Sequence, residues 1–180
     1  NMSVDLSAIQ PWVSQGVSTV RWSGGLPLPE PNKNDELTYY EAMVFQGDET
    51  YYPKPKDPSQ ARLERMDYPT DWVAIRTKYF ISTLVPDKQA PGSEVLAIEE
   101  NGNRRYDVGL FFNVDHPFLC TLYIGPLEYG RIKKLGKNLD QTMNFGWAFI
   151  RPISKAVHWF LLFLHNYIPN YGFVLLVFSV

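Results

Sequence analysis

Residues 94–112 read EVLAIEENGNRRYDVGLFF, and this stretch decides the fold class. Two runs rich in strand-forming residues, Glu94–Glu100 and Asn103–Phe112, flank the pair Asn101-Gly102. Asn-Gly is the pair that a two-residue type I′ turn favours, because both of its residues adopt a positive φ at low cost. The stretch therefore predicts a β-hairpin.

Further strands are predicted on both sides of this hairpin. Alternating apolar and polar residues, or clusters of β-branched and aromatic residues, are typical of half-buried strands. Such patterns occur at Val17–Trp22, Leu37–Phe45, Trp72–Val85 and Phe118–Ile124. Trp72–Val85 is either one long strand or two joined strands, and Arg76 is one of the polar residues that alternate with its apolar residues. A series of antiparallel strands with long connections predicts a mainly β fold, an antiparallel β-sandwich with a C-terminal amphipathic helix.

The segments between these strands are predicted to be loops and one short helix. Leu26–Asp35 is rich in proline and is interpreted as an extended loop. Gln46–Thr70 combines prolines with alternating charges, which predicts a long surface loop with one helical turn at Ala61–Met66. Leu127–Leu135 is predicted to form a short helix that ends at Gly136.

Residues 146–180 have a different pattern. A helix over Ile150–Tyr167 places its polar residues within one narrow stripe, interrupted by Leu162, while apolar and aromatic side chains cover the rest. This pattern is typical of a helix lying in a bilayer interface, although a helix packed on a soluble core is the alternative. The residues predicted to contact the membrane interface are Arg151, Lys155, Trp159, Phe160, Leu161 and Leu164.

A short apolar run, Phe173–Val180, follows this helix. It is much shorter than the roughly 20 residues that cross a hydrocarbon core. The run is therefore either a buried strand or the first part of a transmembrane helix.

The net charge of −2 conceals an asymmetry along the chain. Residues 1–127 carry a charge of −6, and residues 128–180 carry +4. The basic residues of the second part are Arg131, Lys133, Lys134, Lys137, Arg151 and Lys155. Near an anionic leaflet each contributes on the order of 1 kcal/mol, while a solvated helix face is the alternative for Arg131 to Lys137. The acidic balance and the lack of a binding motif argue against a nucleic-acid partner.

Residue types that carry catalysis or bind metals are sparse. The single cysteine, Cys120, lies in an apolar strand, where a thiol behaves as a small hydrophobe, so pairing with His116 as a nucleophile is disfavoured. His158 and His165 are two helical turns apart, which is too far for a shared metal without other ligands. We expect no catalytic residue, no cofactor and no metal.

Several short motifs occur in the C-terminal part of the chain. They are Tyr123-Ile124-Gly125-Pro126, Leu135-Gly136, Asn144-Phe145-Gly146-Trp147, Pro152, Trp159-Phe160-Leu161 and Asn170-Tyr171-Gly172-Phe173. Over about residues 109–180 their order and spacing resemble those of the YidC-type membrane protein insertases of bacterial inner membranes, while Lys78–Pro86 and Trp22–Leu28 match more loosely.

This resemblance implies a fold and a place in a larger protein. The family's periplasmic domain is a β-supersandwich, similar to sugar-mutarotase and carbohydrate-binding domains, with one transmembrane segment before it and five after it. The implied division is the C-terminal part of that domain (1–145), an interfacial amphipathic helix (146–168) and the start of a truncated transmembrane helix (169–180).

The resemblance also implies a function. The family's transmembrane segments form a hydrophilic groove whose arginine receives polar parts of a substrate, because polar groups in hydrocarbon are costly unless hydrated or paired. By the family's pattern this arginine falls just after Val180. The implied role is that of the periplasmic portion of an insertase and chaperone, on the periplasmic side of the inner membrane. The implied partners are membrane lipid, nascent membrane proteins (through the rest of the insertase) and the Sec translocon.

A secreted carbohydrate-binding or mutarotase-like sandwich is the alternative function. Sugar sites combine exposed aromatic side chains with carboxylates. The candidate aromatic residues are Trp22, Tyr39, Tyr40, Trp72 and Tyr79. Ordinary packing of a sheet explains these residues better, and specific binding in calorimetry with a panel of sugars would favour the alternative.

Overall fold

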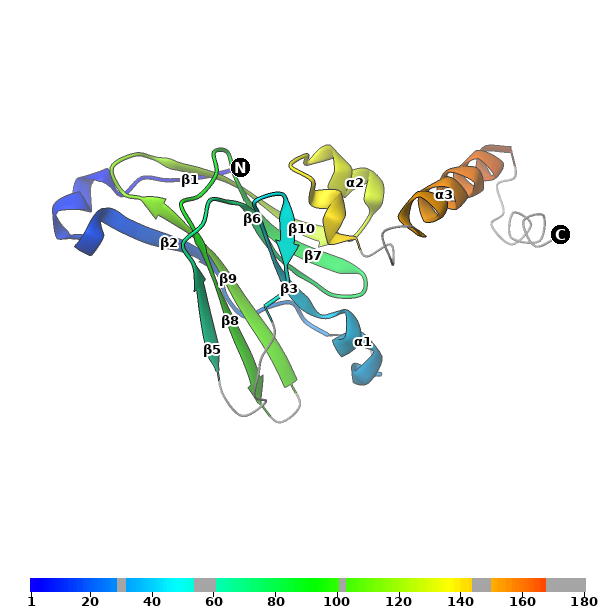
Figure 1. Cartoon of the computed structure of the whole chain (residues 1–180), viewed down its shortest axis with the longest axis horizontal. Coiled ribbons are helices and arrows are strands. Elements are labelled where there is room, and N and C mark those ends of the chain that lie inside the picture. Colours follow the sequence, from blue (N-terminus) through cyan, green and yellow to red (C-terminus); the bar gives the residue numbers. More distant parts are fainter. Residues whose placement is uncertain (29–31, 54–60, 101–102, 144–149, 168–180) are drawn as a thin grey trace. The chain divides into compact units, whose positions relative to one another are not determined.

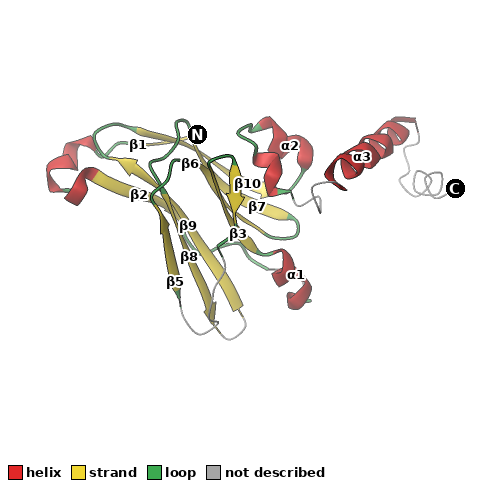
Figure 2. Cartoon of the chain, viewed as in Figure 1, coloured by secondary structure: helices red, strands yellow, loops and turns green. Residues whose placement is uncertain are grey.

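The computed structural model describes residues 1–180 except 29–31, 54–60, 101–102, 144–149 and 168–180. The chain divides into two compact units, Asn1–Thr142 and Met143–Val180. Strands are the main secondary structure of the first unit, and the described secondary structure of the second is one helix, as Figure 2 shows. The run Phe173–Val180 and the division predicted at 169–180 lie outside the described residues, and all the predicted boundaries stay predictions.

The first unit contains two antiparallel sheets (Figure 1). The larger sheet has the strand order β1-β10-β7-β6-β3-β4. Its strands are β1 (Met2–Val4), β3 (Glu41–Gln46), β4 (Glu49–Tyr51), β6 (Thr70–Arg76), β7 (Phe80–Pro86) and β10 (Phe118–Pro126). The segment Trp72–Val85 thus contains two strands, joined by a short connection, rather than one long strand.

The smaller sheet has the order β2-β9-β8-β5. Its strands are β2 (Val17–Trp22), β5 (Arg62–Met66), β8 (Ser93–Glu100) and β9 (Asn103–Asn113). Glu100 pairs with Asn103 at the end of the β8–β9 ladder, which confirms the predicted hairpin; the turn residues 101–102 lie outside the described part. The two sheets confirm the predicted mainly β sandwich.

The central strand β6 is buried on both of its faces. Val73 and Ile75 belong to the core between the two sheets, where they meet Val108 and Leu110 of β9. Trp72 and Ala74 belong to a second core on the other face of the large sheet. A strand that is covered on both sides needs a nearly continuous apolar sequence, and β6 has one.

Short helices cover that second face. α2 (Tyr129–Lys134) and the 3-10 helix η3 (Leu139–Thr142) insert Ile132 and Leu139, both fully buried, into the second core. Gly136, with φ +72°, follows α2 in the left-handed conformation that commonly ends a helix. The predicted helix over Leu127–Leu135 is confirmed, with slightly narrower bounds.

The prediction of one strand over Leu37–Phe45 is wrong in its first part. A helix, α1, occupies Lys33–Tyr39, and β3 begins only at Glu41. The Asn32 side chain caps α1 by accepting a hydrogen bond from the backbone N–H of Asp35 at 3.4 Å. Asparagine at this position and acidic residues in the first turn stabilise a helix start, and here they end the stretch interpreted as an extended loop.

The predicted helical turn at Ala61–Met66 is also wrong, because Arg62–Met66 forms strand β5. β5 pairs with β8 in the register Leu63↔Leu96, and Met66 packs against the core between the sheets. A segment of five residues is too short for its apolar pattern to distinguish a helix from a strand. The available backbone partner in β8 therefore determines that this segment forms a strand. β4 likewise lies within the predicted loop Gln46–Thr70.

Candidate functional site

The predicted membrane-interface residues all lie on one helix, α3 (Ile150–Tyr167). Its bounds agree with those expected from the sequence. Lys155 is exposed, Leu161 and Leu164 are half-buried, and the side chain of Arg151 lies outside the described residues. The structure therefore brings these residues onto one element, while their contact with lipid stays a prediction.

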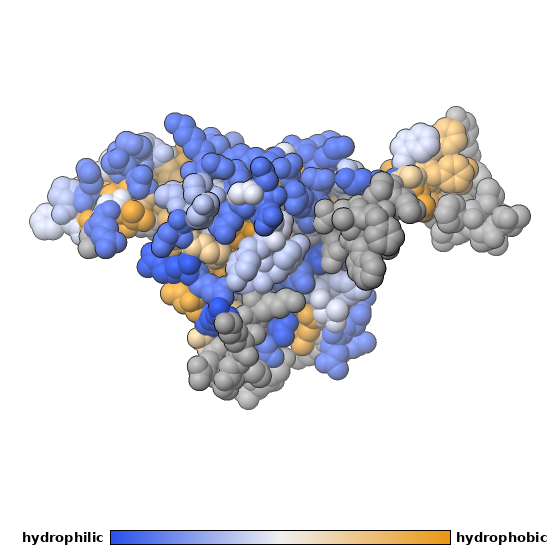
Figure 3. Space-filling view, viewed as in Figure 1, coloured by the Kyte–Doolittle hydropathy of each residue, from blue (hydrophilic) through white to orange (hydrophobic). Residues whose placement is uncertain are grey.

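Aromatic side chains of α3 are open to solvent. Trp159 is 66% exposed and Phe160 is 41% exposed, and Phe163 stacks on Trp159 with the ring centroids 5.7 Å apart. Residues four apart on a helix lie on the same side, so this stack forms a continuous apolar surface. Figure 3 shows apolar side chains gathered on the described part of α3. Within the described ranges, no helix combines the length and the apolar character that a bilayer crossing needs.

The end of the first unit is fixed to strand β6 by two buried side chains. Trp72 Nε1 donates a hydrogen bond to the carbonyl oxygen of Lys137 at 2.9 Å. Arg76 Nη1 donates to the carbonyl oxygen of Thr142 at 3.0 Å, while its Nη2 pairs with Glu41 Oε2 at 3.0 Å. We call residues 129–142 the α2–η3 segment. These bonds satisfy backbone carbonyls that would otherwise be unpaired on the covered face of the sheet.

Sequence reasoning missed the role of Arg76. In the alternating pattern of a half-buried strand, Arg76 is one of the polar residues, whose side chains are expected to be solvated. In the structure its side chain is 5% exposed. Its hydrogen-bond partner Thr142 is 66 residues away in sequence, so no local signal identifies it.

The basic residues of the α2–η3 segment have different surroundings. Lys137 Nζ donates to the carbonyl oxygens of Pro86 and Asp87 and is thereby held on the end of β7. Arg131 forms an exposed ion pair with Glu128 at 2.7 Å, and Lys133 Nζ lies 5.5 Å from the centre of the Tyr129 ring. Lys134 is exposed.

Cys120 lacks the properties of a catalytic nucleophile. It is 1% exposed in the core between the sheets, and burial raises the pKa of its thiol to about 11. A reactive cysteine needs a lowered pKa and solvent access. His116 is exposed instead, and its Nε2 lies 3.3 Å from Asp115 Oδ2. The described residues contain no group of three or more side chains suited to hold a metal ion.

The aromatic residues considered for sugar binding do not form one surface. Trp72 and Tyr40 are fully buried, so neither can stack on a sugar. Tyr39 and Tyr79 are exposed, but Lys78 Nζ lies over both rings, at 5.9 and 5.3 Å, and forms an ion pair with Asp35. The side chain of Trp22 donates to the carbonyl oxygen of Gly25.

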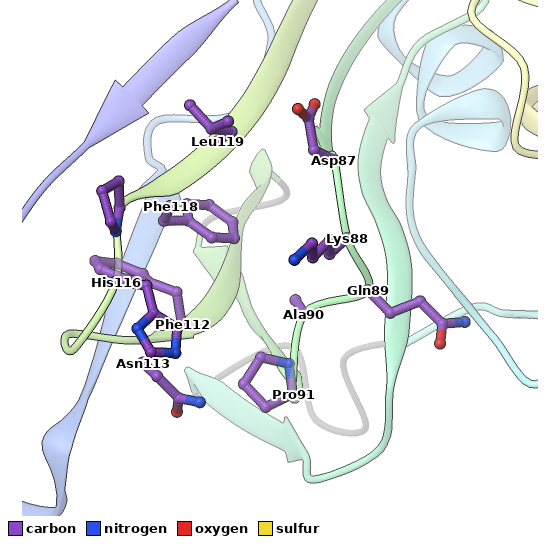
Figure 4. Close-up of a pocket in the computed structure, with 11 residues that line it drawn as sticks. Asp87, Lys88, Gln89, Ala90, Pro91, Phe112, Asn113, His116, Phe118 and Leu119 are labelled. Atoms are coloured by element: carbon purple, nitrogen blue, oxygen red, sulfur yellow. The ribbon is translucent and has the colours of Figure 1, made fainter.

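The first unit also has a shallow pocket of about 350 Å³ at the ends of β7 and β9. In Figure 4, Asp87 to Pro91 line one side, and Phe112, His116 and Phe118 line the other. The Phe112 and Phe118 rings stack with centroids 4.9 Å apart.

Comparison with known proteins identifies the family. Residues 2–160 match the model of the YidC periplasmic domain. The chain is similar to the membrane protein insertase YidC of Chlorobium luteolum (29% identical, covering 89% of this chain and 29% of the relative) and of Prosthecochloris aestuarii (30%, 89% and 29%). The YidC of Chloroherpeton thalassium is 27% identical and matches 98% of the chain. The chain thus spans about a third of the length of these relatives. Because the family match covers nearly the whole chain, this protein belongs to the YidC periplasmic domain family.

Proposed function

We propose that this chain is the periplasmic part of a membrane protein insertase of a bacterial inner membrane. The observation that carries the proposal is α3, a helix without acidic residues that exposes Trp159, Phe160 and Phe163 directly after a folded domain of the YidC periplasmic family. The names of the relatives support the insertase role.

In this proposal α3 lies in the interfacial plane of the bilayer. Its apolar side chains enter the boundary between headgroups and acyl chains, and Arg151 and Lys155 remain among the phosphates. Tryptophan suits this depth because its ring is apolar and its N–H is polar. Residues 169–180 then begin a transmembrane helix, and the rest of the insertase carries the groove that receives nascent membrane proteins.

The sandwich has a non-catalytic role in this proposal. It is a rigid body whose last residues, the α2–η3 segment, are held on the large sheet by Trp72 and Arg76. Such a body can position α3 relative to the transmembrane part, can act as a chaperone for emerging clients, and can offer a surface to the Sec translocon.

Vesicle flotation of the 180-residue chain tests the membrane contact. Replacing Phe160, Leu161 and Leu164 by serine removes apolar area from α3 and is expected to abolish flotation with neutral vesicles, because each side chain contributes roughly 1.5–3 kcal/mol when fully buried. A matched control places serine at Leu63, Leu119 and Ile124, three apolar residues of the sandwich that are about half exposed.

The control variant is expected to float like the unmodified chain. Equal flotation of the α3 variant and the unmodified chain contradicts the proposal, since the apolar face of α3 then packs on protein. In the full-length insertase, the α3 variant is expected to fail to support growth when the native insertase is depleted, while the control variant supports it.

A further inference from the structure

The helix α2 carries three exposed basic side chains. Ile132 is fully buried in the second core, so the residues around it on this short helix point away from the sheet. These are Arg131, Lys133 and Lys134, and all three are exposed. Lys137, in contrast, is held by the carbonyl oxygens at the end of β7.

The charge of this face is only partly neutralised within the part of the chain that the structure describes. Arg131 has Glu128 as its partner, in an exposed ion pair that contributes little to stability. No carboxylate of the described residues forms an ion pair with Lys133 or Lys134. Acidic residues outnumber basic ones over residues 1–127, so this basic face lies on an otherwise acidic unit.

The position of this face is fixed by the fold. Trp72 and Arg76 hold the α2–η3 segment at Lys137, which precedes η3, and at Thr142, the last residue of η3. Only residues 143–149 separate this segment from α3 in the sequence. The basic face therefore belongs to the part of the domain that precedes the membrane helix.

We propose that the face formed by Arg131, Lys133 and Lys134 binds the anionic headgroups of the bilayer, as a second membrane contact in addition to α3. The inference rests on the proposed function, because it takes the bilayer as the surface that the domain meets. Phospholipid phosphates complement exposed cations, and such contacts need no pocket, only a charged surface near the headgroups. The bilayer is favoured over an acidic protein or a nucleic acid because only residues 143–149 separate this face in sequence from α3, which the proposed function places at the membrane.

The test compares binding of the 180-residue chain to vesicles of phosphatidylcholine alone and to vesicles that also contain phosphatidylglycerol. Replacing Arg131, Lys133 and Lys134 by glutamine is expected to leave binding to neutral vesicles unchanged. Binding to anionic vesicles is expected to fall about 100-fold at low salt, since each basic residue near an anionic surface contributes about fivefold. Added salt should remove most of the difference between the two vesicle types.

A control of equal charge separates a local contact from a general effect of net charge. This control variant carries glutamine at three other basic positions: Arg62 in β5, Lys88 in the connection between β7 and β8, and Arg105 in β9. The control is expected to keep its preference for anionic vesicles. Equal losses in the two variants, or no loss in the α2 variant, overturn the inference.

The same measurement distinguishes this inference from the proposed role of α3. The α3 serine variant loses binding to neutral and anionic vesicles alike if α3 is the anchor. If the α3 variant still binds neutral vesicles while the α2 variant loses its preference for anionic vesicles, the proposal that α3 is the anchor is contradicted and the proposal for the basic face is supported.

A spectroscopic probe reports the contact directly. Lys133→Cys, labelled with an environment-sensitive fluorophore, is expected to shift its emission to the blue with anionic vesicles only. Labelling is selective because the native Cys120 is buried. Lys88→Cys is the matched control and is expected to show no shift; identical spectra from the two positions overturn the inference.

Discussion

The guanidinium of Arg76, on the central strand β6, donates a hydrogen bond to the carbonyl oxygen of Thr142 across 3.0 Å. Thr142 is the last residue of the first unit, so a core strand holds the point at which the chain leaves the sandwich. The same guanidinium pairs with Glu41, and its side chain is 5% exposed. Removal of Arg76 takes away the donor that it supplies to both partners.

We expect Arg76→Ala to lower the free energy of unfolding of the first unit by about 2–4 kcal/mol, because the loss of one partner leaves a carboxylate and a carbonyl without their donor. Urea denaturation measures this value. Arg104→Ala is the control, since Arg104 pairs with Glu99 in a more exposed position, and it is expected to cost less than about 1 kcal/mol. Equal losses in the two variants contradict the prediction.

Trp72 makes a second link between β6 and the α2–η3 segment. Its ring stacks on Phe45 at 5.2 Å, and its Nε1 donates to the carbonyl oxygen of Lys137. Trp72→Phe keeps an aromatic ring in the core but removes the donor. We expect a loss of about 1–2 kcal/mol in the free energy of unfolding and faster amide hydrogen exchange at residues 129–142, because this segment opens more often.

Trp22→Phe is the matched control for this exchange measurement. Trp22 Nε1 also donates to a backbone carbonyl, that of Gly25, but in the connection after β2. The control is expected to leave exchange at residues 129–142 unchanged. Faster exchange of that segment in both variants means that global destabilisation, rather than the lost hydrogen bond, is the cause.

The elements that the sequence predicts correctly are those with strong local signals. The hairpin of β8 and β9 follows from the turn pair Asn101-Gly102, and α2 follows from its glycine end signal at Gly136. The helix α3 follows from an 18-residue segment whose polar residues repeat at the helical period. Each of these signals lies within the element or beside it.

The features that the sequence does not predict depend on distant partners. β5 forms because β8 offers it a free backbone edge. Arg76 is buried because the α2–η3 segment, more than fifty residues downstream, covers its face of the sheet. The amphipathic pattern of α3 is predictable from the sequence, but helical periodicity does not identify what its apolar face contacts.

Gly25 is required for close packing as well as for its backbone conformation. Its φ is +66°, and a Cβ at this position would collide with the hydroxyl of Tyr40, which accepts a hydrogen bond from the backbone N–H of Leu26. We expect Gly25→Ala to lower the free energy of unfolding by about 2–4 kcal/mol, the sum of left-handed strain and overpacking.

The neighbouring Gly24 separates these two effects. Its φ is +94°, but a Cβ there would meet no atom within 4 Å. Gly24→Ala therefore carries the backbone strain alone, and we expect a loss of about 1–2 kcal/mol in urea denaturation. A Gly25 variant no less stable than the Gly24 variant contradicts the role assigned to the contact with Tyr40.

Burial of Cys120 makes the stability of the first unit sensitive to alkaline pH. The folded thiol has its pKa raised to about 11 from an ordinary value of 9.0, mainly because burial disfavours the thiolate. The folded state therefore retains a proton that the unfolded chain releases first. This contribution to stability is fully present below about pH 9 and is lost as the pH rises through about 11, with a slope of at most about 1.4 kcal/mol per pH unit.

Urea denaturation of the native chain and of Cys120→Ala, from neutral pH to about pH 11, isolates this effect. The variant lacks the thiol at every pH, so the difference in stability between the two proteins is expected to be constant below about pH 9 and to shift steadily against the native chain above it. Tyr106, whose pKa is raised to about 12 by burial, also destabilises the fold at high pH, but it does so equally in both proteins and cancels in the difference. A difference that does not change with pH shows that the Cys120 thiol titrates in the folded state as it does in the unfolded chain.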